Sequence, residues 1–131
     1  MATDDEDRVM TFTELVGVYD ADGGVVGEAR YVIGHLLGRT ECALCDITHS
    51  PVRRKPAWDA MTKALGIPFA LVHRNEQSAD VAAVTATCGL PAVVGRDASG
   101  AWRAVLTRDA LRAAEGSVPD FERILTTALT R

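Results

Sequence analysis

Two cysteines separated by two residues, Cys42 and Cys45, form the pair whose type and spacing most directly suggest chemistry. A thiolate attacks a disulfide, and a nearby second thiol then resolves the mixed disulfide, so a Cys-x-x-Cys pair suits thiol–disulfide exchange. A helical turn over residues 42–49 would place Cys42 at its N-terminus, where unpaired N–H groups favour an anion. The pattern therefore predicts a redox pair, with Cys42 as the nucleophile and Cys45 as the resolving thiol.

The same pair also fits a metal site. His49 completes a Cys-x2-Cys-x3-His pattern, and His35 lies seven residues before Cys42. Two thiolates and two imidazoles suit tetrahedral zinc, and two sulfur ligands also suit Cu(I). Zinc or copper bound by Cys42, Cys45, His49 and His35 is therefore the alternative to redox chemistry. A binding module in which the two thiols only pack is the third alternative.

Composition indicates the class of protein that surrounds these residues. The chain has 131 residues, of which 47% are hydrophobic and 24% charged, the mixture of a globular domain rather than a disordered chain. Its net charge of −4 has the wrong sign for a nucleic-acid-binding surface. There is no signal-peptide pattern and no apolar run of about 18 residues, so we expect a cytoplasmic protein without a membrane segment. In that reducing compartment a close cysteine pair is more often catalytic or metal-binding than structural.

The elements that must position the pair alternate between strands and helices. Hydrophobic periodicity and capping residues predict, in order, a strand at 15–19, a helix at 25–37, a helix at 56–65, a strand at 69–73, a helix at 78–88, a hairpin of 90–94 with 101–106, and closing helices after Thr107 and Ser117. This order predicts an α/β domain over 12–131, with a central mixed sheet of about four strands and helices on both faces. The acidic residues 1–11 are expected to form a tail.

Other residues that invite a functional interpretation are expected to be structural. Cys88 lies on the apolar side of its predicted helix and is expected to be a buried packing thiol. His73 ends a predicted strand and is expected at the surface. The basic run 53–55 is expected to be a solvated loop, and Trp58 and Trp102 to pack in the core or the hairpin.

The element order, together with Cys88-Gly-Leu-Pro-Ala-Val-Val94 and Asp97-Ala-Ser-Gly100, resembles the thioredoxin-like fold. In that superfamily a cis-proline precedes the first strand of the terminal hairpin and faces a Cys-x-x-Cys at a helix start. The resemblance implies that Pro91 is this cis-proline and that the Cys42–Cys45 pair acts on protein thiols or a small-molecule disulfide. The chain also resembles a group of small bacterial proteins of unassigned function, through residues 19–22, His35, Cys42, Cys45, Thr48, His49 and Trp58.

One departure from the superfamily affects where the pair lies. The dithiol of the superfamily follows the first strand almost directly, whereas here the extra helix predicted at 25–37 comes before Cys42. If that helix is an insertion, the chain returns to the usual position and Cys42 faces Pro91. If it is the superfamily's own first helix, the dithiol lies beyond its far end, away from Pro91.

Overall fold

The computed structural model describes residues 12–21, 42–50 and 53–130. The helix predicted at 25–37, including His35, and the tail predicted at 1–11 lie outside the described residues. The elements below are therefore those of the described ranges.

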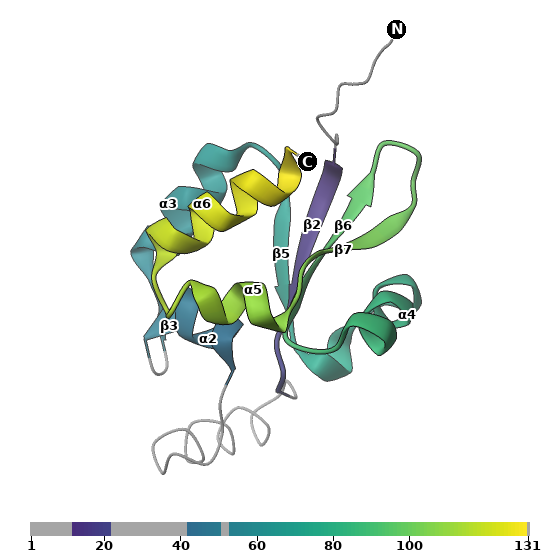
Figure 1. Ribbon diagram of the computed structural model, residues 1–131, viewed down its shortest axis with the longest axis horizontal. Helices are drawn as coiled ribbons and strands as arrows, with labels where there is room; N and C mark the ends of the chain where they lie inside the picture. Colours follow the sequence, from purple (N-terminus) through teal and green to yellow (C-terminus); the bar gives the residue numbers. More distant parts are fainter. Residues whose placement is uncertain (1–11, 22–41, 51–52, 131) are drawn as a thin grey trace, which may run out of the picture.

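Four strands form the central sheet, in the order β5–β2–β6–β7 (Figure 1). Strand β2 (Phe12–Val18) is parallel to β5 (Phe69–Val72) and antiparallel to β6 (Ala92–Asp97), which in turn pairs antiparallel with β7 (Trp102–Leu106). A parallel neighbour requires a crossover connection, and the helices at Ala43–Thr48 and Pro56–Leu65 lie between β2 and β5 in the chain, whereas a four-residue turn suffices between β6 and β7. The expected mixed sheet of about four strands is confirmed.

Local sequence signals determine most helix boundaries. Helix α3 (Pro56–Leu65) begins with a proline at its first position and ends at Gly66, whose φ of 76° is left-handed. Helix α4 (Ala79–Cys88) is capped by the Ser78 hydroxyl, which accepts the Val81 N–H at 3.2 Å. The remaining helical elements are α2 (Ala43–Thr48), the 3-10 turn η1 (Arg74–Glu76), α5 (Arg108–Ala113) and α6 (Val118–Leu129).

Helices cover both faces of the sheet, as expected. On one face α2, α3, α5 and α6 bury the larger core, in which the ring of Trp58 lies 5.1 Å from those of both Phe69 and Phe121. On the other face α4 packs Val81 against Val16 and Val94. In Figure 1, α4 stands to one side of the strands and α3 and α6 stand to the other. The sheet is thus the middle layer, and both of its faces are apolar.

Two predictions about the chain near the sheet were wrong. The basic run is not a loop at residues 53–54: strand β4 (Arg53–Arg54) pairs with β3 (His49–Ser50) in a short antiparallel hairpin, although Arg54 is exposed to solvent as expected. The pairing is extended by a bond from the Lys55 N–H to the Thr48 carbonyl at 2.7 Å, a contact that charge pattern alone does not reveal. Strand β2 also begins earlier than predicted, because Phe12 is buried and pairs with Asp97 at the far end of β6.

Candidate functional site

The two cysteines lie at the start of α2, with Cys42 immediately before the helix and Cys45 in its first turn. Cys42 is the N-cap residue with an extended backbone (φ −150°, ψ 107°), and its Sγ accepts the Cys45 N–H at 3.3 Å. This is the role that a serine or aspartate side chain usually takes at a helix start. No disulfide joins any of the three cysteines. The Cys-x-x-Cys spacing therefore places the Cys42 sulfur within hydrogen-bond distance of the Cys45 main-chain N–H.

The two thiols differ in burial. Cys42 is 1% exposed and belongs to the larger core, together with Leu44 and Ile47 of the same helix. Cys45 is half-buried and packs at the margin of that core. Helix α2 thus presents one cysteine inward and the other toward its partly exposed side.

Hydrogen bonds determine the ionisation of Cys42. A hydrogen bond from the Cys45 side chain lowers the pKa of the Cys42 thiol below its ordinary value, and main-chain bonds from Asp20 and Cys45 act in the same direction. Burial and the negative charge of Asp20 oppose this shift. The donors prevail, so the surroundings make Cys42 easier to ionise than an ordinary thiol.

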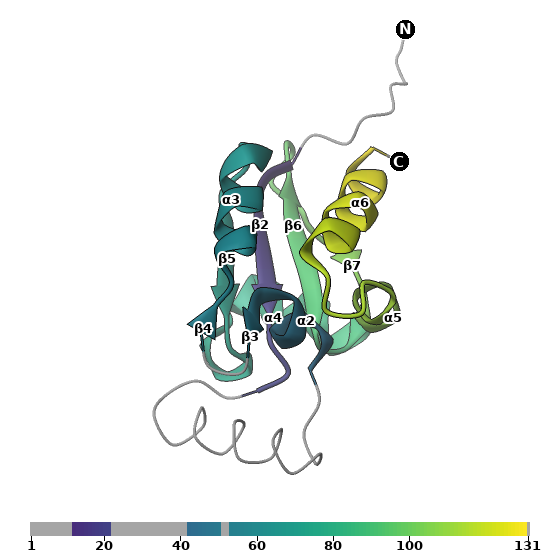
Figure 2. The ribbon, with the colours of Figure 1, turned by 90° about the vertical axis from the view of Figure 1, so that its left-hand side faces the viewer.

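Cys42 and Pro91 lie at the same end of the sheet. Cys42 receives its main-chain bond from Asp20, two residues after the end of β2. Ala92 pairs with Val18, the last residue of that strand, and the peptide bond that joins Leu90 to Pro91 just before it is cis, as expected. Figure 2 shows α2 beside this end of β2. Cys42 and Pro91 therefore both lie near the C-terminal end of β2.

A buried hydrogen-bond chain connects α2 to the end of β2. The Tyr19 hydroxyl lies 2.9 Å from Thr48 Oγ1, which lies 2.6 Å from Nδ1 of His49. Thr48 also donates to the Cys45 carbonyl at 3.4 Å, so the chain reaches the backbone of the cysteine pair. Burial raises the pKa of Tyr19 far above its ordinary value, so the phenol is neutral.

Sequence reasoning assigned no role to Tyr19 or Thr48. The signal available was a tyrosine directly after a buried strand and a threonine three residues after Cys45. His73, expected at the surface, is half-buried, and its ring lies 5.2 Å from that of Tyr19. The two rings meet because Tyr19 follows the last residue of β2, His73 follows the last residue of β5, and Val18 and Val72 at these two strand ends are paired.

The predicted metal ligands are only partly placed. Within residues 12–21, 42–50 and 53–130, no three His, Cys, Asp or Glu side chains form a group that could hold a metal ion. His49 turns its Nδ1 toward Thr48 and Tyr19. His35 lies outside the described residues.

Cys88 stands apart from the other two thiols. It is half-buried against the smaller core beneath α4, less completely buried than expected, and burial raises its thiol pKa. Its Sγ lies 3.5 Å from the Gly89 carbonyl, to which it donates. These features agree with a packing role.

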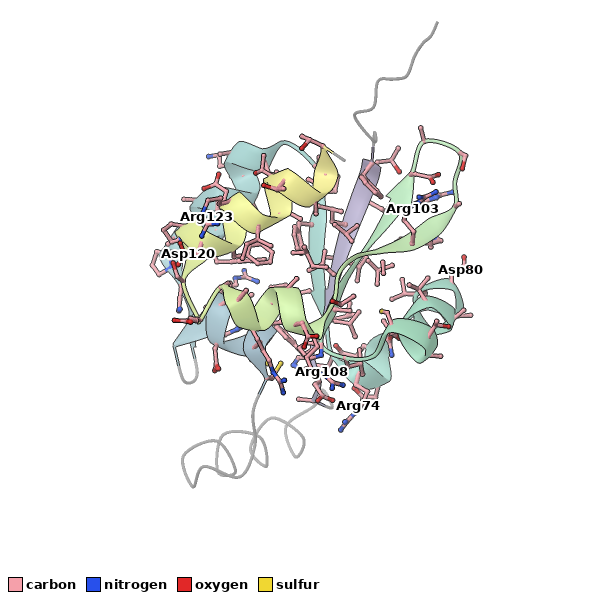
Figure 3. All side chains as sticks on the ribbon, viewed as in Figure 1. Arg74, Asp80, Arg103, Arg108, Asp120 and Arg123 are labelled. Atoms are coloured by element: carbon pink, nitrogen blue, oxygen red, sulfur yellow. The ribbon has the colours of Figure 1, made fainter. Side chains whose placement is uncertain are left out.

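Charged side chains border the end of the sheet that carries the site. Arg74 pairs with Asp20 at 3.3 Å, and Nε of Arg108 donates to the Leu90 carbonyl at 2.8 Å, next to Pro91. Figure 3 shows both arginines at the lower end of the molecule. The guanidinium of Arg108 thereby holds the loop that carries the cis peptide bond.

Comparisons with protein-family models, with curated proteins and with solved structures find no match for this chain. None of the helices in the described ranges has the length and apolar run that a bilayer-spanning segment requires.

Proposed function

We propose that this chain is a thioredoxin-like dithiol protein that carries out thiol–disulfide exchange through Cys42 and Cys45. One observation carries the proposal: the Sγ of Cys42 accepts the Cys45 N–H at 3.3 Å, at the end of β2 toward which the chain around cis-Pro91 also converges. The resemblance implies a dithiol at a helix start close to a cis-proline, and here the two lie at the same end of the sheet.

The chemistry of the pair supports this function. The attacking species in disulfide exchange is a thiolate, and the hydrogen bonds around Cys42 lower its pKa while a second thiol lies one helical turn away. In the complete reaction an external disulfide gains two electrons and is released as two thiols, while Cys42 and Cys45 become an intramolecular disulfide. A protein disulfide or a small-molecule disulfide is the substrate class, and the reducing cytoplasm is the expected compartment.

The test is whether the pair cycles between dithiol and disulfide. Equilibration of the full chain with glutathione buffers of graded potential, followed by alkylation and mass measurement, should show a loss of two alkylatable thiols in one two-electron step. Cys42→Ser and Cys45→Ser should each abolish that step and reduce disulfide reductase activity by about two orders of magnitude or more. Cys88→Ser is the matched control and should leave both unchanged. Retention of the activity in both active-pair variants would refute the proposal.

The metal alternative has an opposite signature in the same preparation. Near-stoichiometric zinc or copper in protein purified without chelator, lost in Cys45→Ser or His49→Ala, would show that the pair is a metal site rather than a redox pair. The proposal expects less than about a tenth of an equivalent of either metal and two titratable thiols.

A further inference from the structure

The burial of the two cysteines bears on the order in which they react. Cys42 is 1% exposed, lies in the core beside Leu44 and Ile47, and its sulfur already accepts the Cys45 N–H. A thiolate attacks a disulfide along the line of the sulfur–sulfur bond, so the incoming molecule needs room in front of the attacking sulfur. At Cys42 that room is filled by protein.

Cys45 has the access that Cys42 lacks. It is half-buried, and it shares the partly exposed side of α2 with Ala43 and Asp46, whereas Leu44 and Ile47 face inward. The accessible sulfur and the sulfur held among hydrogen-bond donors are therefore on different residues. Attack on external disulfides requires access as well as ionisation.

We propose that Cys45 is the thiol that exchanges first with the external disulfide and that Cys42 is the buried thiol that resolves the mixed disulfide. This inference rests on the proposed thiol–disulfide exchange and reverses the roles that the sequence order of the pair predicts. It assigns the substrate contact to the second cysteine of the motif.

The Cys45 side chain donates a hydrogen bond to the Cys42 sulfur, and this contact gives the proton a route between the two thiols. As Cys45 attacks, its thiol proton passes to the Cys42 thiolate, a new bond forms between Cys45 and one substrate sulfur, and the other substrate sulfur leaves as a thiolate. That leaving thiolate then takes the proton from Cys42. The Cys42 thiolate attacks the Cys45 sulfur, the bond from Cys45 to the substrate breaks, and the second substrate thiolate departs. The substrate disulfide is reduced, and Cys42 and Cys45 end as a disulfide.

The first experiment uses the native pair and needs no substitution in it. Reduced protein that carries Cys88→Ser is treated with less than one equivalent of iodoacetamide, and the alkylated positions are mapped by peptide mass. The inference expects at least about ten times more label on Cys45 than on Cys42. Predominant labelling of Cys42 would overturn it.

The second experiment compares matched variants with a chromogenic aromatic disulfide, 5,5′-dithiobis(2-nitrobenzoate). In the Cys88→Ser background, Cys42→Ser should form a mixed disulfide at Cys45 that persists, at a rate at least about tenfold above that of Cys42 in Cys45→Ser. A faster reaction of Cys42 contradicts the assignment of roles but leaves the exchange itself intact. If the protein with both cysteines forms no intramolecular disulfide with this reagent, the proposed function fails as well.

Discussion

At the scale of single residues, the position of Cys42 as an N-cap links its ionisation to the helix it begins. The Cys42 sulfur accepts hydrogen bonds from the Cys45 N–H and from the Asp20 main chain. Hydrogen bonds of this kind are stronger to an anion, so they stabilise the thiolate of Cys42 more than its thiol. The bond from the Cys45 side chain is the largest of these contributions. When the reduced pair loses its first proton, the proton that remains is therefore shared between the two sulfurs, and the anion is favoured at Cys42.

This sharing predicts how the thiols titrate. In reduced Cys88→Ser protein, the thiolate absorbance near 240 nm should persist to a pH below the ordinary thiol pKa of about 8.5. Cys45→Ala removes the donor and should move the midpoint of this absorbance to higher pH, whereas Cys45→Ser retains a hydroxyl donor and should move it less. A midpoint at the ordinary thiol value in the protein with both cysteines would contradict the hydrogen-bonding scheme.

At the scale of elements, the short helix α2 depends on its neighbours for its position. It has six residues, too few to be stable alone, and is held by the Tyr19–Thr48 bond at 2.9 Å and by its packing in the larger core. The β3–β4 hairpin continues directly from its last residue. The geometry of the thiol pair therefore depends on the stability of the sheet and the hairpin that contact α2.

The close contact at Gly95 allows a test of the sheet that supports the site. A Cβ at this position in β6 would lie 2.6 Å from Cδ1 of Phe12 and 2.9 Å from Cγ2 of Val105. Gly95→Ala must displace a buried ring, and overpacking of this kind costs about 1–3 kcal/mol in the free energy of unfolding. Urea denaturation measures the loss.

The matched control for Gly95→Ala is a second variant in which the contacting side chain of Phe12 is made smaller. Phe12→Ala removes the whole ring, including the Cδ1 and Cε1 atoms nearest to the added methyl group, so the double variant Phe12→Ala/Gly95→Ala should lose less than the sum of the two single losses. Full additivity, or wild-type stability of Gly95→Ala, would be inconsistent with the contact.

At the scale of the whole molecule, contacts between distant segments close the domain around the site. Nζ of Lys55, the residue before α3, donates to the Gly116 carbonyl between α5 and α6 at 2.7 Å, across 61 positions of sequence. The turn between β6 and β7 is organised by Asp97, whose Oδ1 accepts the Ser99 hydroxyl at 2.5 Å and the Ala101 N–H at 3.1 Å. Stability therefore depends on a few polar groups in turns as well as on the two cores.

The carboxylate of Asp97 predicts an acid-dependent loss of stability. The hydrogen bond from the Ser99 hydroxyl lowers the pKa of Asp97 in the folded chain. The ionised carboxylate therefore stabilises the fold above its unfolded pKa of about 3.9, and this contribution is lost as the pH falls through the lower folded value. Asp97→Asn should lower the melting temperature at pH 7, and the difference from wild type should shrink as the pH falls below the unfolded pKa of about 3.9. A difference that stays constant down to pH 2 would contradict this account.

The sequence by itself determined the elements with local signals. Pro56 and Gly66 delimit α3, Ser78 caps α4, and the turn after Asp97 separates two strands, because each signal acts on backbone a few residues away. The sequence left open whether residues 42–49 form a helical turn, and the structure shows that α2 begins directly after Cys42. Only the tertiary structure decided which thiol of the Cys42–Cys45 pair is buried. It also decided two pairings between segments: the hydrogen bond of Tyr19 with Thr48, across 29 positions, and the pairing of Arg53–Arg54 with His49–Ser50. Burial and these pairings depend on what the rest of the chain packs against a residue, and the spacing of cysteines carries no information about that.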